Sequence, residues 1–324
     1  HQKLVLHLSF YPGPLAQLGE RVNGIHEVSG SIPLRSTKII PSSPPAPTQL
    51  LKGIPMKPTI SASIILLLIL LPLVAFSTDT TSTRVITPGV VHTKYTLPGP
   101  FTLDVLEIDL KNQFIQFESY RPNGLTKTSV QSAANDREGH RVIAAVNGDF
   151  FNADGSPVGN QVVGGTIVQG IKSFRSHLDI TEDKRPYIEV VTFSCTVTAK
   201  GGNNLTLNGV NTARSAGFAI LYTPYRGSST GTTGSGIECS LSLLSPKWRI
   251  NDTLLFLVTS KQTSGNLAIP INGAVLSGAI GSPADFITAN ITVNDTIKIY
   301  PHFGPQSMTN VFQLLGGAGR ILRN

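Results

Sequence analysis

The chain has 324 residues, enough for one large domain or two ordinary ones, so its length is no obstacle to a hydrophobic core. Charged residues make up only 14% and aromatic residues 7%, beside 31 glycines and 22 prolines, a composition that favours strands and turns over a helical bundle. The net charge of +7 divides into +4 over residues 1–77 and +3 over residues 78–324. No basic run interleaved with aromatic residues stands out in the second part, so we expect no nucleic-acid partner.

The first 55 residues differ in character from the rest of the chain. They show neither helical nor strand periodicity and end in a Pro/Ser-rich stretch, Pro41–Pro55. The stretch from Leu15 to Lys38 resembles conceptual translations of transfer-RNA genes. We interpret residues 1–55 as upstream, non-native translation; the alternative is a disordered basic extension. On either interpretation we expect this segment to be unstructured.

Residues 56–77 have the layout of a secretory signal peptide. The short basic start at Met56-Lys57 precedes the apolar run Ile64–Phe76, and small residues stand three and one positions before Thr78, the expected first mature residue. The alternative is a single membrane anchor, an apolar helix over residues 60–76 that Pro72 interrupts. Both interpretations predict export, either as a secreted protein or in the cell envelope with membrane association through residues 60–76.

In the exported part, alternating apolar and polar residues predict a half-buried strand over Phe101–Leu110 and a partner strand over Phe114–Tyr120. Thr126–Arg137 is the best helix candidate, because threonines can cap its start and a glycine can stop it. The nearly continuous apolar run Arg141–Val146 is typical of a strand covered on both faces.

After Gly170 the pattern is strand and turn. Strands are predicted over Tyr187–Thr198, Phe218–Tyr222, Cys239–Leu244, Asp252–Val258, Ile271–Leu276 and Thr288–Tyr300, and Tyr225–Gly236 is expected to be a surface loop. Residues 78–324 should therefore form an α+β domain with a mixed, mostly antiparallel β-sheet and few helices. Cys195 and Cys239 could pair in an oxidising compartment, although their separation says nothing about geometry.

The loop after Arg141–Val146 is a candidate site, because a buried strand fixes the backbone and leaves the following loop free to carry functional groups. It holds Asn147 and Asp149, with glycines beyond them that let a ligand approach the backbone. The alternative is a tight turn followed by two core phenylalanines. The acidic residues nearby do not fit a calcium-loop spacing, so no metal or other cofactor is expected. Arg175 is suited to a phosphate, whereas His177 is more often explained as structural.

These residues also carry a family resemblance. Ala144–Phe151, Gly155–Gly159 and the glycine-rich stretch to Gly170 resemble the signature of the phosphodiester glycosidase family. Four later segments are similar to family segments in the same order: Leu207–Arg214, Leu221–Pro224, Pro270–Ser277 and Leu315–Asn324. The resemblance as a whole covers roughly Val90–Asn324. Family members continue beyond the point that matches Asn324, through an Asp-Gly-Gly-Gly-Ser-like motif, so we expect this chain to be truncated at its carboxyl end.

The resemblance implies a hydrolase that cleaves a sugar-1-phosphodiester on exported glycoconjugates to free sugar and a phosphomonoester; animal members remove N-acetylglucosamine in this way. Its partner would be a carbohydrate phosphodiester. The implied site comprises Asn147 and Asp149 as catalytic residues that orient the sugar or water, Arg175, Arg214 and Arg320 for the phosphate, and Gly148, Gly159 and Gly165 around the substrate. The alternative is a non-catalytic, exported, cell-surface glycan-binding domain that uses Tyr225–Gly236 and nearby strands.

Overall fold

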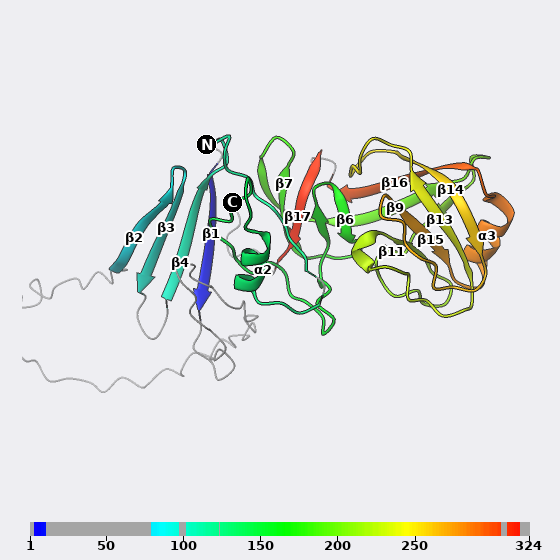
Figure 1. Ribbon diagram of the computed structural model, residues 1–324, viewed down its shortest axis with the longest axis horizontal. Helices are drawn as coiled ribbons and strands as arrows, with labels where there is room; N and C mark the ends of the chain where they lie inside the picture. The colour runs from blue at the N-terminus through cyan, green and yellow to red at the C-terminus, as the bar shows by residue number, and fades with distance from the viewer. Residues whose placement is uncertain (1–2, 11–78, 97–101, 123, 306–309, 318–324) are drawn as a thin grey trace, which may run out of the picture.

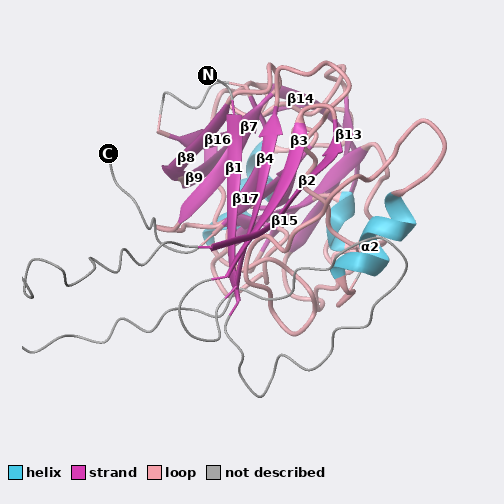
Figure 2. Ribbon diagram, turned by 90° about the vertical axis from the view of Figure 1, so that its left-hand side faces the viewer, coloured by secondary structure: helices cyan, strands magenta, loops and turns pink. Residues whose placement is uncertain are grey.

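The computed structural model describes residues 3–10, 79–96, 102–122, 124–305 and 310–317, which form three sheets along the long axis of the molecule (Figure 1). The first sheet has the order β1-β4-β3-β2, with β1 at Lys3–Phe10, β4 at Thr102–Asp109, β3 at Val90–Thr96 and β2 at Asp79–Thr87. Seen along that axis, helix α2, Thr128–Asn135, lies to one side of these strands (Figure 2).

The middle sheet has five strands in the order β6-β5-β17-β7-β8. Their bounds are Thr166–Gln169, Gln161–Val163, Val311–Gly316, Ser176–Thr181 and Pro186–Val190. Strand β17, from the end of the described chain, lies between β5 and β7 and pairs antiparallel with both. This insertion brings residues 311–317 beside residues that precede them by more than a hundred positions.

The third sheet has eight strands in the order β10-β9-β16-β14-β13-β15-β12-β11. Their bounds are Asn204–Thr206, Thr192–Thr198, Thr296–Gly304, Leu254–Gln262, Ile237–Leu243, Gly273–Gly278, Ala219–Tyr222 and Gly209–Val210. Helix α3, Ser282–Asn290, packs against it, and a short 3-10 helix covers Pro224–Arg226. Among the described strands, the pairing of β11 with β12 is parallel and the other ladders are antiparallel. The predicted α+β class, with a mixed, mostly antiparallel sheet and few helices, is confirmed.

The main hydrophobic core lies between the eight-stranded sheet, helix α3 and one face of the five-stranded sheet. Strand β9 shows how the sequence builds it, because Phe193, Cys195 and Val197 alternate with more exposed residues and all three are buried. Val162 and Leu314 enter the same cluster from β5 and β17. Burying each such side chain stabilises the fold by about 1.5–3 kcal/mol. The middle sheet is therefore attached to the third sheet by apolar packing.

Several local expectations are wrong. Arg141–Val146 is not a strand and is not buried on both faces, because no neighbouring strand pairs with it; the Val142 N–H donates instead to Asp136. Phe114–Tyr120 likewise forms turns and irregular backbone. Within Thr288–Tyr300, helix α3 runs to Asn290 and β16 begins only at Thr296, after a turn.

The structure describes only a small part of the amino-terminal region, residues 3–10. Lys3–Phe10 forms β1 and pairs antiparallel with β4, so the expectation of an unstructured segment is wrong for these 8 residues. The rest of residues 1–55 and the expected apolar helix at 56–77 lie outside the described residues. Within the described ranges, no helix is both long and apolar enough to cross a membrane.

The two cysteines do not pair. Both are free and buried, Cys195 on β9 and Cys239 on β13. Strands β16 and β14 stand between those two strands in the sheet, so the thiols are separated by far more than a disulfide allows. Burial raises the pKa of Cys195 to about 12 and that of Cys239 to about 11.

Candidate functional site

Asp149 lies at the centre of the candidate site, on the loop that crosses the end of β17. Its side chain is only 3% exposed. One carboxylate oxygen, Oδ1, accepts the Phe150 N–H at 2.7 Å, and the other accepts the Gly159 N–H. The carboxylate is therefore held by backbone donors, in an orientation set by the loop.

Three glycines let this loop lie against β17. A side-chain carbon added at Gly159 or at Gly316 would overlap the Asp149 carboxylate, and one added at Gly148 would overlap Leu315. The resemblance assigns Gly148 and Gly159 to the surroundings of the substrate. In the structure they lie beside Asp149, where the missing side chains allow the backbone to approach the carboxylate and Leu315 closely. Gly316 was not anticipated, because nothing local in the sequence links it to residue 149.

Arg175 is the cation of the site. Its Nη2 lies 3.1 Å from Asp149 Oδ1, its Nε donates to the Gly317 carbonyl at 2.9 Å, and its guanidinium carbon lies 4.8 Å from the centre of the Phe150 ring. Its side chain is 26% exposed, so one edge of the guanidinium reaches solvent. Arg175 and Asp149, which the resemblance assigns to one site, form an ion pair.

The charge state of Asp149 reflects two opposed effects. Burial raises the pKa of the carboxyl, and the Arg175 charge and the two backbone N–H donors lower it, but the burial effect is larger. The pKa of Asp149 is therefore higher than that of an ordinary aspartate. A carboxyl with a raised pKa next to a fixed cation is a chemically unusual arrangement that is enriched in functional sites.

His177, on β7, has the structural role that the sequence suggested. Its Nδ1 donates to the Arg175 carbonyl at 2.9 Å, and its Nε2 accepts the Asn160 N–H at 3.0 Å. Gly316 stands opposite His177 in the ladder and carries no side chain, so the ring can reach across β17 to β5. Burial lowers the pKa of His177 to about 4, which keeps the ring neutral. It fixes the backbone that carries Arg175.

Asp179 was missed by sequence reasoning. It lies two residues beyond His177, on the same face of β7, and is fully buried. Neither carboxylate oxygen has a hydrogen-bond partner in the described part of the chain, and burial raises its pKa to about 7. The sequence pattern that could have identified Asp179 is the alternation of Arg175, His177 and Asp179, because residues two apart in a strand lie on one face.

Other predicted site residues lie elsewhere. Asn147 is exposed, and its side-chain oxygen accepts a hydrogen bond from the Thr128 hydroxyl of α2. Gly165 lies in the β5–β6 turn, where its N–H donates to the Phe312 carbonyl. Arg320 is outside the described residues. No group of three or more possible metal ligands occurs within the part of the chain that the structure covers.

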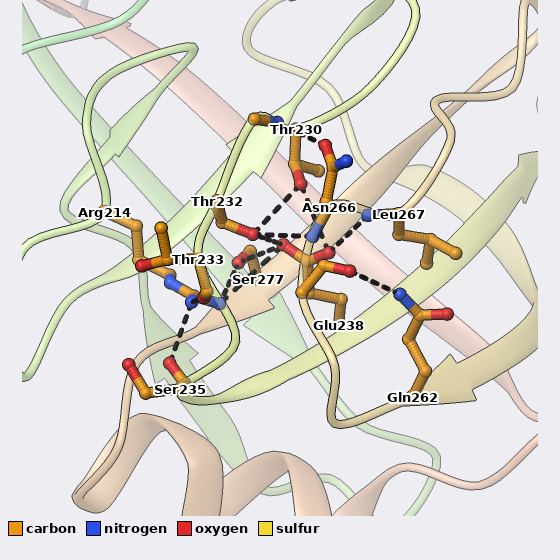
Figure 3. A network of polar contacts seen from close by, with 12 residues as sticks. Arg214, Thr230, Thr232, Thr233, Ser235, Glu238, Gln262, Asn266, Leu267 and Ser277 are labelled. Atoms are coloured by element: carbon orange, nitrogen blue, oxygen red, sulfur yellow. Dashed lines mark hydrogen bonds and ion pairs between the residues drawn. The ribbon is translucent and has the colours of Figure 1, made fainter.

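Arg214 lies on the connection between β11 and β12 and is in a cluster with Glu238, not in contact with Asp149 or Arg175. It is buried on the third sheet, where it faces Glu238 and donates to the carbonyls of Thr233 and Ser235 and to the Ser277 hydroxyl (Figure 3). Both of its Nη atoms have partners, and only 4% of its side chain is exposed.

The cluster around Glu238 also includes residues of the predicted surface loop Tyr225–Gly236. The hydroxyls of Thr230 and Thr232 both donate to Glu238, and Thr230 is fully buried. Those two hydroxyls are therefore engaged inside the protein. The loop is held to the sheet by a charged residue that sequence analysis did not single out.

No protein-family model matches the chain, and no curated protein matches it significantly. Two crystal structures are similar to it in fold. A hypothetical protein from Synechocystis shares 16% identity with a TM-score of 0.54 over 76% of this chain and 46% of that one. A protein described as a "putative exported protein", from Burkholderia pseudomallei, shares 18% identity with a TM-score of 0.48 over 71% and 50%. The chain spans about half the length of each, and the first likeness shows a shared fold alone.

Proposed function

We propose that this chain belongs to a hydrolase of glycosyl phosphodiesters, with Asp149 and Arg175 in its active site. The observation that carries the proposal is the contact of a buried carboxyl of raised pKa with a partly exposed guanidinium, 3.1 Å apart. The family resemblance of the segment Ala144–Gly170, which contains Asp149, supports the same conclusion.

The reaction needs the two groups that this pair supplies. Water adds to the anomeric carbon, the bond from that carbon to the phosphate oxygen breaks, and the proton of water ends on the departing phosphomonoester or its surroundings. A carboxylate held beside the reacting water can accept that proton and pass it on, as in other glycoside hydrolyses. In this proposal Asp149 is the proton-transfer residue.

Arg175 would bind the phosphate. Its Nε and Nη2 are used by Gly317 and Asp149, while among the described residues no partner occupies Nη1. A guanidinium fixed on two sides presents its remaining N–H groups in a set direction, which suits a phosphate oxygen. Phe151 and Phe174, which neighbour the site in sequence, are 64% and 87% exposed and offer apolar surface beside it.

The test is hydrolysis of the methyl phosphodiester of N-acetylglucosamine 1-phosphate by the protein made from its complete gene. We expect release of free sugar, and Asp149→Asn should lower kcat/KM by about 100-fold or more. Arg175→Lys should mainly raise KM, because lysine cannot reproduce the planar contact.

The chain offers a matched control in the exposed pair Asp183 and Arg185, 2.7 Å apart. Asp183→Asn and Arg185→Lys should leave kcat/KM unchanged. No sugar release by the wild-type protein would overturn the proposed function. Normal specific activity in Asp149→Asn would instead remove Asp149 from the site while leaving the activity standing.

We also propose that the protein is exported, on the basis of the basic start, apolar run and small residues within residues 56–77. Mass spectrometry of the culture medium and the cell envelope of the native host tests this. A mature amino terminus near Thr78 is expected in the medium. An envelope-bound form that retains residues 60–76 would support the anchor, and recovery only from the cytoplasm would contradict export.

A further inference from the structure

A cavity of about 180 Å³ lies where the middle and third sheets meet, at the beginning of β17. It is lined by Trp248, Arg249 and Asp252 from the connection between β13 and β14, by Glu182 and Lys247, and by backbone around Gly165. Strand β17 separates it from the Asp149 site: Val311 lines the cavity, and Gly316 touches Asp149. Five residues of strand span roughly 17 Å, so the two places are distinct.

The walls of this cavity are held in place by contacts that do not depend on a ligand. The Trp248 ring packs edge-on against Phe256, with centroids 5.4 Å apart. Asn251 exchanges two hydrogen bonds with the Phe303 backbone, at 3.0 and 2.8 Å. Gly165 has a φ of +81° and approaches the Trp248 carbonyl so closely that a side-chain carbon there would lie 2.9 Å from it. The cavity is therefore preformed, which lowers the cost of binding.

The charges that line the cavity balance. Glu182 and Asp252 are acidic, and Lys247 and Arg249 are basic. Lys247 Nζ lies 2.5 Å from Glu182 Oε1, and both Lys247 and Arg249 lower the pKa of Glu182. A net anion would meet the two carboxylates and a net cation the two basic groups, so the lining favours a neutral ligand that can both donate and accept hydrogen bonds.

We propose that this cavity binds a single neutral hexopyranose, such as the terminal sugar of a glycan. Its volume is below the roughly 300–1,000 Å³ of drug-sized pockets, so one ring fits and a peptide segment does not. The indole of Trp248 supplies an apolar surface for the C–H face of the ring, while Arg249 donates to hydroxyls and Asp252 accepts from them. This site is independent of the proposed hydrolysis.

The chain contains one tryptophan, Trp248, so fluorescence excited selectively at tryptophan reports on this cavity. The experiment titrates the wild-type protein with the methyl glycosides of glucose, galactose, mannose and N-acetylglucosamine, and separately with inorganic phosphate. We expect at least one glycoside to change Trp248 emission saturably, with a Kd on the order of 1 mM for a single ring. Phosphate should leave the emission unchanged.

Variants separate the cavity from a nonspecific effect. Arg249→Ala and Asp252→Ala should each weaken glycoside binding about tenfold or more, whereas Arg137→Ala, an exposed arginine beyond α2, should not. Trp248→Phe removes the reporter, so its binding is followed by saturation-transfer NMR and should also be weaker. Asp149→Asn should bind normally, which keeps this test apart from the hydrolase test. The proposal is overturned if no glycoside alters the emission, if phosphate alone does so, or if Arg249→Ala binds like wild type.

Discussion

Arg214 Nη1 lies 3.7 Å from Glu238 Oε1, and the two side chains are 4% and 0% exposed. Glu238 also accepts hydrogen bonds from Thr230, Thr232, Ser277 and the Leu267 N–H. This buried pair joins the loop Tyr225–Gly236 to strands β13 and β15 (Figure 3). Its removal should therefore affect the fold and leave the chemistry at Asp149 unaltered.

Glu238→Gln should lower the free energy of unfolding by roughly 3–5 kcal/mol, because it leaves the Arg214 charge buried without its counter-ion. Urea denaturation followed by circular dichroism measures this as a lower midpoint with an unchanged slope. In contrast, Asp183→Asn removes an exposed pair and should cost less than about 1 kcal/mol. Equal stability of Glu238→Gln and wild type would show that the network contributes little.

Gly316→Ala should damage the Asp149 site, because the added methyl would overlap the carboxylate. We expect a loss of roughly 1–3 kcal/mol in stability from overpacking, and a fall in kcat/KM of about 100-fold if Asp149 is displaced. The neighbouring variant Gly317→Ala is the control, since its nearest atom would be 3.5 Å away, an ordinary contact. The same activity in both variants would argue against a role for the close approach at residue 316.

Asp179 should make stability depend on pH. Its pKa in the folded state, about 7, is above the ordinary aspartate value of 3.8, so the folded state keeps a proton that the unfolded state loses. Stability should therefore fall as pH rises from about 4 to about 7. Asp179→Asn mimics the protonated acid and should be more stable than wild type at pH 8, by on the order of 4 kcal/mol, with the difference vanishing below pH ~4. Urea titrations of both proteins across this range measure it; a pH-independent difference would contradict the buried, protonated state.

Cys195 and Cys239 should not react with a thiol reagent in the native protein, because both thiols are buried and their pKa values are raised. Ellman's reagent should detect two thiols only after addition of denaturant. Electrophoresis should show the same mobility with and without reductant. A mobility shift on reduction would show that the cysteines pair after all, and would contradict the strand order of the third sheet.

The sequence predicted the strands whose pattern is local. The alternation in Phe101–Leu110 predicted β4, and the short apolar runs at Phe218–Tyr222 and Cys239–Leu244 predicted β12 and β13. The predicted bounds of these strands agree with the observed ones within a few residues. The prediction of a strand over Arg141–Val146 was wrong. An apolar run forms a buried strand only where neighbouring strands pair with it, and no strand pairs with this one. Whether an apolar segment becomes a strand depends on partners that periodicity does not reveal.

For the candidate site, the sequence by itself determined which residues could carry chemistry: Asp149 in a glycine-rich loop and Arg175 as a cation suited to phosphate. Only the tertiary structure decided that these two form an ion pair and that Arg214 belongs to a separate cluster with Glu238. The reason is that β17 inserts between β5 and β7 and places Gly316 under Asp149. A contact between residues so distant in the chain is set by strand order and core packing, which a local pattern does not encode.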